Sequence, residues 1–218
     1  MSHPRPDAHR LLRAADALLV DLDGTLVDSD AAVRRAWGAF ARRHGLDPGE
    51  VHRRAHGRPS RETVRDLLPA GADHAAEAAR LEHHEVHDTE GVVALPGARE
   101  LLARPGRPLA IVTSCSTALA RARLAAADLP RPDVLVSSDG LARGKPDPAP
   151  FLLGAQRLGI EPARCVVLED SPAGIAAGRA AGAVVIALRT THDGPDLRDA
   201  HAVVDDLATL VAALRRAA

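Results

Sequence analysis

Aromatic residues are nearly absent from this sequence of 218 residues, which contains one tryptophan, two phenylalanines and no tyrosine. Many proteins bind single-stranded nucleic acid by stacking its bases on aromatic rings, so this composition argues against that class. The formal net charge of -1 gives no general basic field for nucleic acid or anionic lipid, although arginine is plentiful. We therefore expect a small-molecule partner, and neither nucleic acid nor a membrane.

Cysteine is also scarce, and long apolar runs are missing. Cys115 and Cys165 are too few for a disulfide framework and fit a reducing compartment. No stretch approaches the roughly 18 apolar residues that a membrane-spanning helix needs. The start of the chain is polar and lacks the apolar core of a secretion signal. We expect a flexible N-terminal extension over residues 1–16 and a cytoplasmic protein.

What the sequence does contain is a regular alternation of short apolar runs and helical patterns. Hydrophobic residues make up 46% of the chain, enough for a globular core. Alternation of this kind is typical of a Rossmann-like α/β fold, a parallel sheet with helices on both faces. The predicted strands span residues 17–22, 108–113, 133–137, 164–169 and 183–188.

One long section interrupts the alternation directly after the first strand. Residues 29–95 predict helices only, and among them Val33, Trp37 and Phe40 follow helical spacing. We assign residues 17–28 and 96–218 to the α/β core and residues 29–95 to a helical cap. Open α/β sheets bind ligands at the carboxyl ends of their strands, so an insert at that edge is placed to act as a lid.

Two aspartates stand at the end of the first strand, in the motif D-x-D-G-T. Asp21 and Asp23 are separated by Leu22, and Gly24 permits a tight turn after them. Because side chains alternate along a strand, both carboxylates can face the same crevice. Their mutual repulsion then needs a cation or a shared proton to offset it.

The other predicted strands place more polar side chains at the same edge of the sheet. The second strand leads to Thr113 and Ser114, the third leads toward Lys145, and the fourth ends at Glu169 and Asp170. A carboxylate cluster suits Mg²⁺, which prefers oxygen ligands and keeps several waters. Hydroxyls, backbone N–H groups and a lysine around such a metal suit a phosphoryl group.

These residues resemble the four motifs of the haloacid dehalogenase superfamily of phosphotransferases. The motifs are "DLDGT", a strand ending in "IVTS", "GKP", and "LEDSPAG". The insert resembles the small helical cap that this superfamily carries between its first and second motifs. Longer stretches, such as "ARGKPDPAPFLLGAQRLG", are similar to bacterial sugar and hexitol phosphatases. The resemblance covers nearly the whole chain after residue 16 and implies phosphomonoester hydrolysis.

The resemblance implies a catalytic role for each aspartate. Asp21 would attack phosphorus and form an aspartyl-phosphate, which splits one difficult hydrolysis into two easier steps. Asp23 would protonate the leaving alkoxide and then accept a proton from the hydrolytic water. The implied substrates are small sugar or polyol phosphates, such as hexitol phosphate, 2-deoxyglucose 6-phosphate or glycerol phosphate.

The resemblance also implies a metal and a phosphate site. Mg²⁺ would be held by Asp21, the backbone carbonyl of Asp23 and Asp170. Glu169 is a further candidate, either as a direct ligand or behind the ligands. Lys145 would pair with Asp21 and the phosphoryl oxygens, and either Thr113 or Ser114 would donate a hydrogen bond to them.

Cap residues would choose the leaving group, since the cap closes over the site. The loop "HGRPSRET" offers His56, Arg58 and Arg61 as substrate contacts. Arg61 sits where β-phosphoglucomutase has an arginine in a G-x-S-R loop. The hexitol phosphatases need not have that arginine, so this assignment has the alternative of an exposed residue at a helix start.

Two other functions compete with hydrolysis. A phosphosugar mutase of the β-phosphoglucomutase type would return the phosphoryl group to the sugar, but such mutases place a histidine where this chain has Val33. A phospho-accepting module without enzymatic activity would share the acidic residues, the hydroxyl and the lysine, but not the helical insert. A dehalogenase has no need of Asp23. We expect a monomer, with a homodimer as the alternative.

Overall fold

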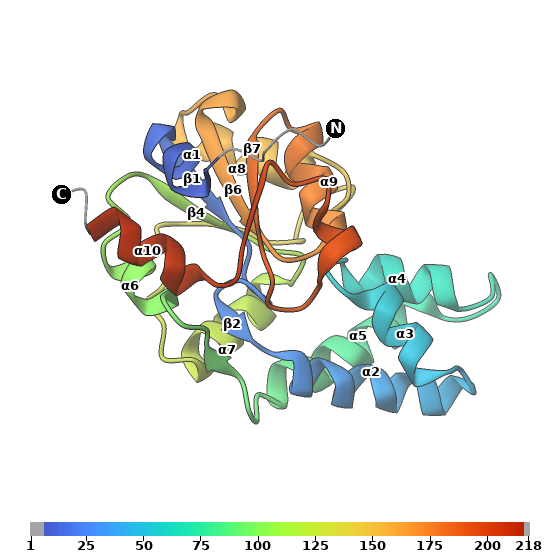
Figure 1. Ribbon diagram of the computed structural model, residues 1–218. Helices are drawn as coiled ribbons and strands as arrows, with labels where there is room; N and C mark the ends of the chain where they lie inside the picture. The colour runs from blue at the N-terminus through green and yellow to red at the C-terminus, as the bar shows by residue number, and fades with distance from the viewer. Residues whose placement is uncertain (1–6, 216–218) are drawn as a thin grey trace.

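The computed structural model describes residues 7–215 and centres on a six-stranded parallel sheet (Figure 1). The order of the strands is β5-β4-β1-β6-β7-β8. Their bounds are β1 (Ala17–Val20), β4 (Leu109–Val112), β5 (Val134–Val136), β6 (Cys165–Glu169), β7 (Val184–Leu188) and β8 (Ala202–Val204). The chain runs outward from β1 to β5 and then returns to β6 beside β1, so β1 and β6 flank the point where the strand order reverses. Ligands of open α/β sheets bind at such a point.

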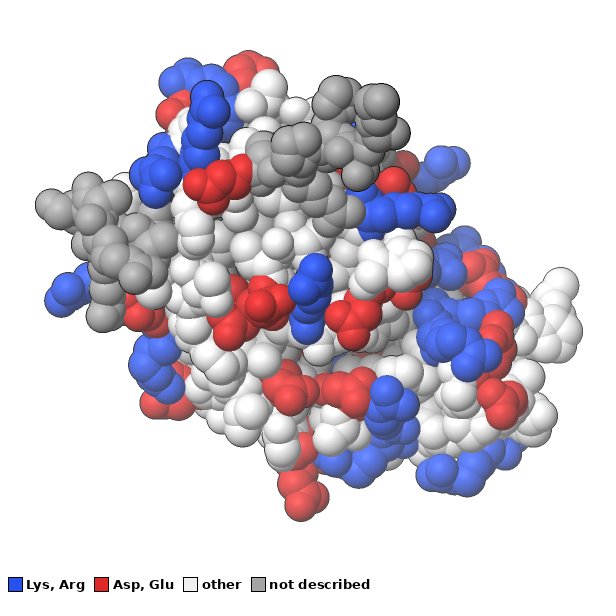
Figure 2. Space-filling view, viewed as in Figure 1, with Lys and Arg blue, Asp and Glu red and all other residues white. Residues whose placement is uncertain are grey.

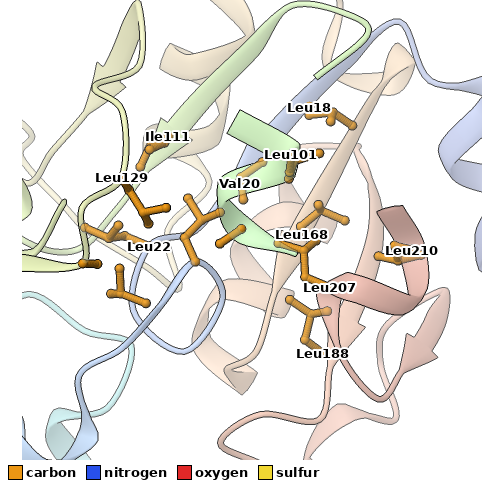
Figure 3. Packing of buried hydrophobic residues seen from close by; sticks show 14 of the residues in the cluster. Leu18, Val20, Leu22, Leu101, Ile111, Leu129, Leu168, Leu188, Leu207 and Leu210 are labelled. Atoms are coloured by element: carbon orange, nitrogen blue, oxygen red, sulfur yellow. The ribbon is translucent and has the colours of Figure 1, made fainter. Parts of the chain in front are cut away.

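Both faces of the sheet are covered by helices, which explains why the strands are continuous apolar runs. Leu18 and Val20 belong to one hydrophobic cluster, and Ala17 and Leu19 belong to the other, as the alternation of a strand requires. The first cluster, part of which Figure 3 shows, packs against α1 (Ala8–Ala14), α6 (Ala98–Ala103), α7 (Thr117–Ala126) and α10 (Leu207–Arg215). The second packs against α8 (Ala149–Leu158) and α9 (Pro172–Ala180). The predicted fold class is confirmed.

Four helices between β1 and β4 form a separate unit beside the sheet (Figure 1). They are α2 (Asp30–His44), α3 (Pro48–Ala55), α4 (Ser60–Leu67) and α5 (His74–His87), hereafter the cap helices. Trp37 and Phe40 pack edge to face in their shared hydrophobic cluster, with ring centroids 5.4 Å apart. A two-stranded antiparallel sheet of β2 (Val27–Asp28) and β3 (Val93–Ala94) joins the chain entering this unit to the chain leaving it.

Some local features differ from the prediction. The expected flexible extension over residues 1–16 is wrong in part, because residues 8–14 form α1 and its Leu12 is buried in the core. Residues 1–6 lie outside the described part. The two short 3₁₀ helices Pro162–Arg164 and Gly194–Leu197, and strand β8, were not expected.

The face of the molecule shown in Figure 2 carries charges of both signs without a single dominant field. Arginine side chains alternate there with Asp and Glu side chains over both the sheet domain and the cap helices. Within residues 7–215, none of the helices combines the length and the apolar character that a membrane span requires.

Candidate active site

A tight turn after β1 holds Asp21 and Asp23 at the carboxyl edge of the sheet. Asp21 N–H still donates to Leu168 O at 3.0 Å, as a continuation of the strand, and Leu22 then turns into the hydrophobic core. Gly24 follows with φ of +78°, and a Cβ at that position would lie 2.0 Å from Asp170 Oδ2. Glycine is therefore required both by the backbone conformation and by the close approach of the β6 loop.

Lys145 is the only lysine in the sequence, and its ammonium group lies between two carboxylates. Nζ donates to Asp21 Oδ1 at 2.5 Å, to Glu169 Oε1 at 2.7 Å and to Val112 O at 3.0 Å. The side chain is 1% exposed. These three contacts hold the ammonium at the carboxyl ends of three adjacent strands, the edge of the sheet at which Lys145 was expected.

Glu169 is held on both of its carboxylate oxygens. Oε1 faces Lys145, and Oε2 accepts from the backbone N–H groups of Asp170 and Ser171 at 2.9 and 3.0 Å and from Ser171 Oγ at 2.9 Å. Gly174 makes room for it, since a Cβ there would lie 1.7 Å from Oε1. These contacts favour a role in holding Lys145 over direct ligation of a metal.

Three carboxylates converge beside Lys145, and two of them, Asp21 and Asp170, could hold a divalent cation. Oxygens of Asp21, Glu169 and Asp170 lie within 4.8 Å of one another, and all three side chains are buried. An all-oxygen donor set of this charge fits Mg²⁺. Asp170 Oδ2 also contacts Thr191 Oγ1 and lies 3.3 Å from His56 Nε2. The predicted ligation through the backbone carbonyl of Asp23 stays a prediction.

Burial and neighbouring charges act on the ionisation of this cluster. Burial raises the pKa of Asp21 well above its ordinary range, and the nearby Lys145 opposes that effect. Burial lowers the pKa of Lys145, but Asp21 and Glu169 outweigh it, so the net shift of the Lys145 pKa is upward. Lys145 is therefore charged at neutral pH. A bound divalent cation would act on Asp21 in the same direction as Lys145, because it would lower the pKa of Asp21 and favour its carboxylate form.

Asp23 has different partners, and one of them, Arg123, escaped the sequence analysis. Ser29 Oγ donates to Oδ1 at 2.7 Å, and Oδ2 contacts Cys115 Sγ at 2.9 Å and Arg123 Nη1 at 2.5 Å. The second missed residue is Glu85 of α5, whose Oε1 lies 3.2 Å from Arg123 Nη2. Burial raises the pKa of Asp23, but Arg123 and the hydrogen bonds outweigh it, so the pKa of Asp23 is lowered overall.

Helix periodicity offered a signal for both missed residues. Arg123 follows Leu119 by four positions on the buried face of α7, and Glu85 follows Leu81 by four on the buried face of α5. A charged residue at a core position of a helix calls for a buried partner. The helical pattern alone did not predict that Arg123 and Glu85 contact each other.

The two candidate hydroxyls for phosphate have different environments. Thr113 Oγ1 accepts from the backbone N–H of Cys115 at 3.1 Å, and Ser114 Oγ donates to the carbonyl of Gly57 in the cap loop at 2.9 Å. Both residues line the cavity that contains Asp21 and Asp23. The choice between them stays open, but the Ser114 hydroxyl is the one that the cap loop engages.

The three predicted cap contacts do not all reach this cavity. His56 and Arg58 line it, and Arg58 also pairs with Asp66 at 2.8 Å. Arg61 instead donates to the carbonyl of Leu141 and lines a neighbouring cavity. The structure thus brings His56 and Arg58 to the aspartates and uses Arg61 to connect the cap to a loop of the core.

The cap lies against the core and leaves little open space above the aspartates. The cavity is about 70 Å³. Pockets that enclose small-molecule ligands usually measure about 300 to 1,000 Å³, so this cavity is small by comparison. The described arrangement is therefore one in which the cap covers the aspartates closely.

Comparisons with known proteins agree with this geometry. The family model for haloacid dehalogenase-like hydrolases matches residues 15–182. Hexitol phosphatase A of Escherichia coli K12 is 50% identical over 194 residues, which are 87% of this chain and 90% of that protein. Validoxylamine A 7'-phosphate phosphatase of Streptomyces hygroscopicus subsp. limoneus is 36% identical over 197 residues, with 87% and 92% covered.

A solved structure supports the same assignment. A hydrolase from Pseudomonas syringae superimposes with a TM-score of 0.80 at 28% identity, covering 93% of this chain and 99% of that one. The family match covers more than half of the chain, and it includes the strand ends that carry Asp21, Thr113, Lys145 and Asp170. The chain belongs to the haloacid dehalogenase-like hydrolases.

Proposed function

We propose that this hydrolase is a Mg²⁺-dependent phosphatase of small sugar or polyol phosphates that works through an aspartyl-phosphate. The observation that carries the proposal is the cavity in which Asp21, paired with buried Lys145, lies beside Asp23. The predicted enzyme class, a phosphoric monoester hydrolase, is confirmed by the family and by relatives that are phosphatases.

In the first step, a carboxylate oxygen of Asp21 attacks phosphorus and the bond to the leaving oxygen breaks. Lys145 neutralises charge on the nucleophile and on the phosphoryl oxygens. Mg²⁺, held by Asp21 and Asp170, would add positive charge and align the phosphoryl group. The leaving group departs on the side opposite Asp21, because displacement at phosphorus is in line.

Asp23 moves the proton in both steps. It donates a proton to the leaving alkoxide and later accepts one from the water that hydrolyses the aspartyl-phosphate. In the described arrangement its pKa is lowered, which suits the base role. Arrival of a phosphate dianion brings negative charge next to the carboxylate and raises its pKa, which suits the acid role.

Water is favoured over a second sugar hydroxyl as the final phosphoryl acceptor. Val33 lines the cavity at the position where a mutase would need a histidine, and its side chain cannot accept a proton. We therefore retain hydrolysis over the mutase and over a phospho-accepting module.

The test is release of inorganic phosphate from a panel of hexitol, hexose and glycerol phosphates, with Mg²⁺ or with a chelator. We expect release with Mg²⁺, loss with the chelator, and a loss of at least about 10³-fold in Asp21→Asn, the size seen when a residue of a catalytic unit is removed. Asp205→Asn, which alters an exposed carboxylate that pairs with Arg189 and does not line the cavity, is the matched control. Full activity of Asp21→Asn would refute the proposal.

A further inference from the structure

A buried ion pair joins the cap to the core at the wall of the active-site cavity. Glu85 comes from cap helix α5 and Arg123 from core helix α7, and their side chains are 4% and 5% exposed. Both residues line the cavity together with Asp21 and Asp23. Figure 1 shows the meeting of the two helices: α7 lies at the lower edge of the core, next to α5.

A buried ion pair of this kind contributes little to the stability of the folded protein. Burying two charges carries a desolvation cost that their attraction often fails to recover, and an apolar pair of similar size is often as stable. The pair is also loosely made. Glu85 Oε1 lies 3.2 Å from Arg123 Nη2, and Oε2 accepts from Ser60 Oγ at 3.3 Å. Both distances are at or beyond the long end of the usual hydrogen-bond range, so the carboxylate has acceptor capacity for a ligand.

Two serines at the starts of cap helices donate their hydroxyl hydrogen bonds to carboxylates of the cavity wall. Ser60 is the first residue of α4 and donates to Glu85, and Ser29 precedes α2 and donates to Asp23. Neither hydroxyl makes a capping hydrogen bond to its own helix. The polar groups at this wall are thus oriented toward the cavity.

The direction of the reaction places the leaving group at this wall. Asp21 and Lys145 hold the phosphoryl end at the sheet, and the leaving group lies opposite the nucleophile. Asp23, which must reach the leaving oxygen, contacts Arg123. The atoms of the substrate beyond that oxygen therefore meet Arg123, Glu85 and the cap residues around them.

We propose that Glu85 and Arg123 bind neighbouring hydroxyls of the leaving group and thereby select polyol and sugar phosphates. Glu85 accepts hydrogen bonds from the hydroxyls and Arg123 donates to them, so the substrate takes the place of their direct contact. The proposal rests on the proposed function, because it assigns a leaving group to that reaction. A leaving group without hydroxyls leaves both buried charges without these partners, which is the basis of selection.

The test compares two substrates in the same variants. One is sorbitol 6-phosphate, whose leaving group is a hydroxylated chain. The other is phenyl phosphate, whose leaving group has no hydroxyl apart from the oxygen that is esterified to phosphorus. In Glu85→Gln, we expect kcat/KM for sorbitol 6-phosphate to fall about 10- to 100-fold, the value of a charge-assisted hydrogen bond. We expect kcat/KM for phenyl phosphate to change less than about 3-fold, so the ratio between the substrates falls.

Two further variants make the result specific. Arg123→Lys keeps the positive charge beside Asp23 but loses the planar donor geometry, and we expect the same selective loss in a milder form. Asp88→Asn is the matched control, because Asp88 pairs with Arg35 at 2.7 Å at the end of the same helix and does not line the cavity. It should leave the substrate ratio unchanged.

The outcomes separate this proposal from the proposed function. An equal loss with both substrates, or no loss in either variant, would overturn the hydroxyl-binding role and leave a phosphatase whose ion pair only joins the cap to the core. If Glu85→Gln does not fold, Arg123→Lys decides by the same ratio. If the unaltered protein releases no phosphate from any polyol or sugar phosphate, the proposed function fails and this proposal fails with it.

Discussion

Replacing Lys145 with methionine removes a cation that two buried carboxylates share. Lys145 Nζ lies 2.5 Å from Asp21 Oδ1 and 2.7 Å from Glu169 Oε1, and all three side chains are nearly inaccessible to solvent. Methionine is of similar length and fills the same space, so the change tests the charge and not the volume. We expect the variant to fold less stably because two carboxylates then repel each other in a medium that solvates them poorly.

The magnitude follows from this environment. Removing one partner of a buried ion pair typically costs about 3 to 5 kcal/mol, because an uncompensated charge stays behind. A second change, Glu169→Gln, removes one of the two carboxylate charges that contact Lys145. Its amide oxygen can accept the hydrogen bonds of Ser171 while its NH₂ group turns toward Asp21. We expect the double variant to recover about 1 to 3 kcal/mol relative to Lys145→Met.

Urea unfolding at neutral pH in the presence of a chelator measures these differences without a contribution from metal binding. Arg189→Met is the control for an exposed pair, since Arg189 and Asp205 are 50% and 80% exposed, and it should cost less than about 1 kcal/mol. A loss below about 1 kcal/mol in Lys145→Met, or a further loss on adding Glu169→Gln, would show that Lys145 does not neutralise the cluster.

Two further predictions address the packing of the site and the thiols. Gly174→Ala should destabilise the protein by at least about 2 kcal/mol, because its Cβ would lie 1.7 Å from Glu169 Oε1, whereas Gly38→Ala in helix α2 should be neutral or stabilising; thermal unfolding compares them. Burial raises the pKa of Cys165 to about 11, so its thiol stays neutral at pH 8. Alkylation followed by mass spectrometry should label Cys165 slowly in the folded protein until the pH nears 11. The stabilising contribution of this neutral thiol is complete below its unfolded pKa of 9.0 and is lost as the pH rises through the folded value. Rapid labelling at pH 8 would contradict the raised pKa.

Five of the six strands of the parallel sheet were predictable from the sequence, because a sheet buried on both faces needs continuous apolar runs, whereas β8 was not expected. The residue after such a run falls at the carboxyl edge, so Asp21, Thr113 and Asp170 could be assigned to one place without knowing the order of the strands. Strands β2 and β3, of two residues each, have too few residues for a pattern. Their pairing depends on the geometry of the chain entering and leaving the cap.

The cap side of the site was less predictable because it depends on contacts between distant segments. Arg123 and Glu85 are 38 residues apart, and only the packing of α5 on α7 brings them together. A serine at a helix start often caps that helix, but the hydroxyl of Ser60 donates to Glu85. When a side chain has two possible hydrogen-bond partners, the tertiary structure decides which of them it contacts, and the local sequence does not predict that choice.

We propose above all that Asp21 carries the phosphoryl group between the two steps. Acid quenching of the protein during turnover, followed by peptide mass spectrometry, tests it most directly. Asp23→Asn with p-nitrophenyl phosphate, whose leaving group needs little protonation, should accumulate the intermediate because the base for its hydrolysis is missing. We predict the mass of one phosphoryl group on the peptide containing Asp21, removed by hydroxylamine and absent from Asp21→Asn. A phosphoryl group on another residue, or turnover by Asp21→Asn at the unaltered rate, would contradict the account.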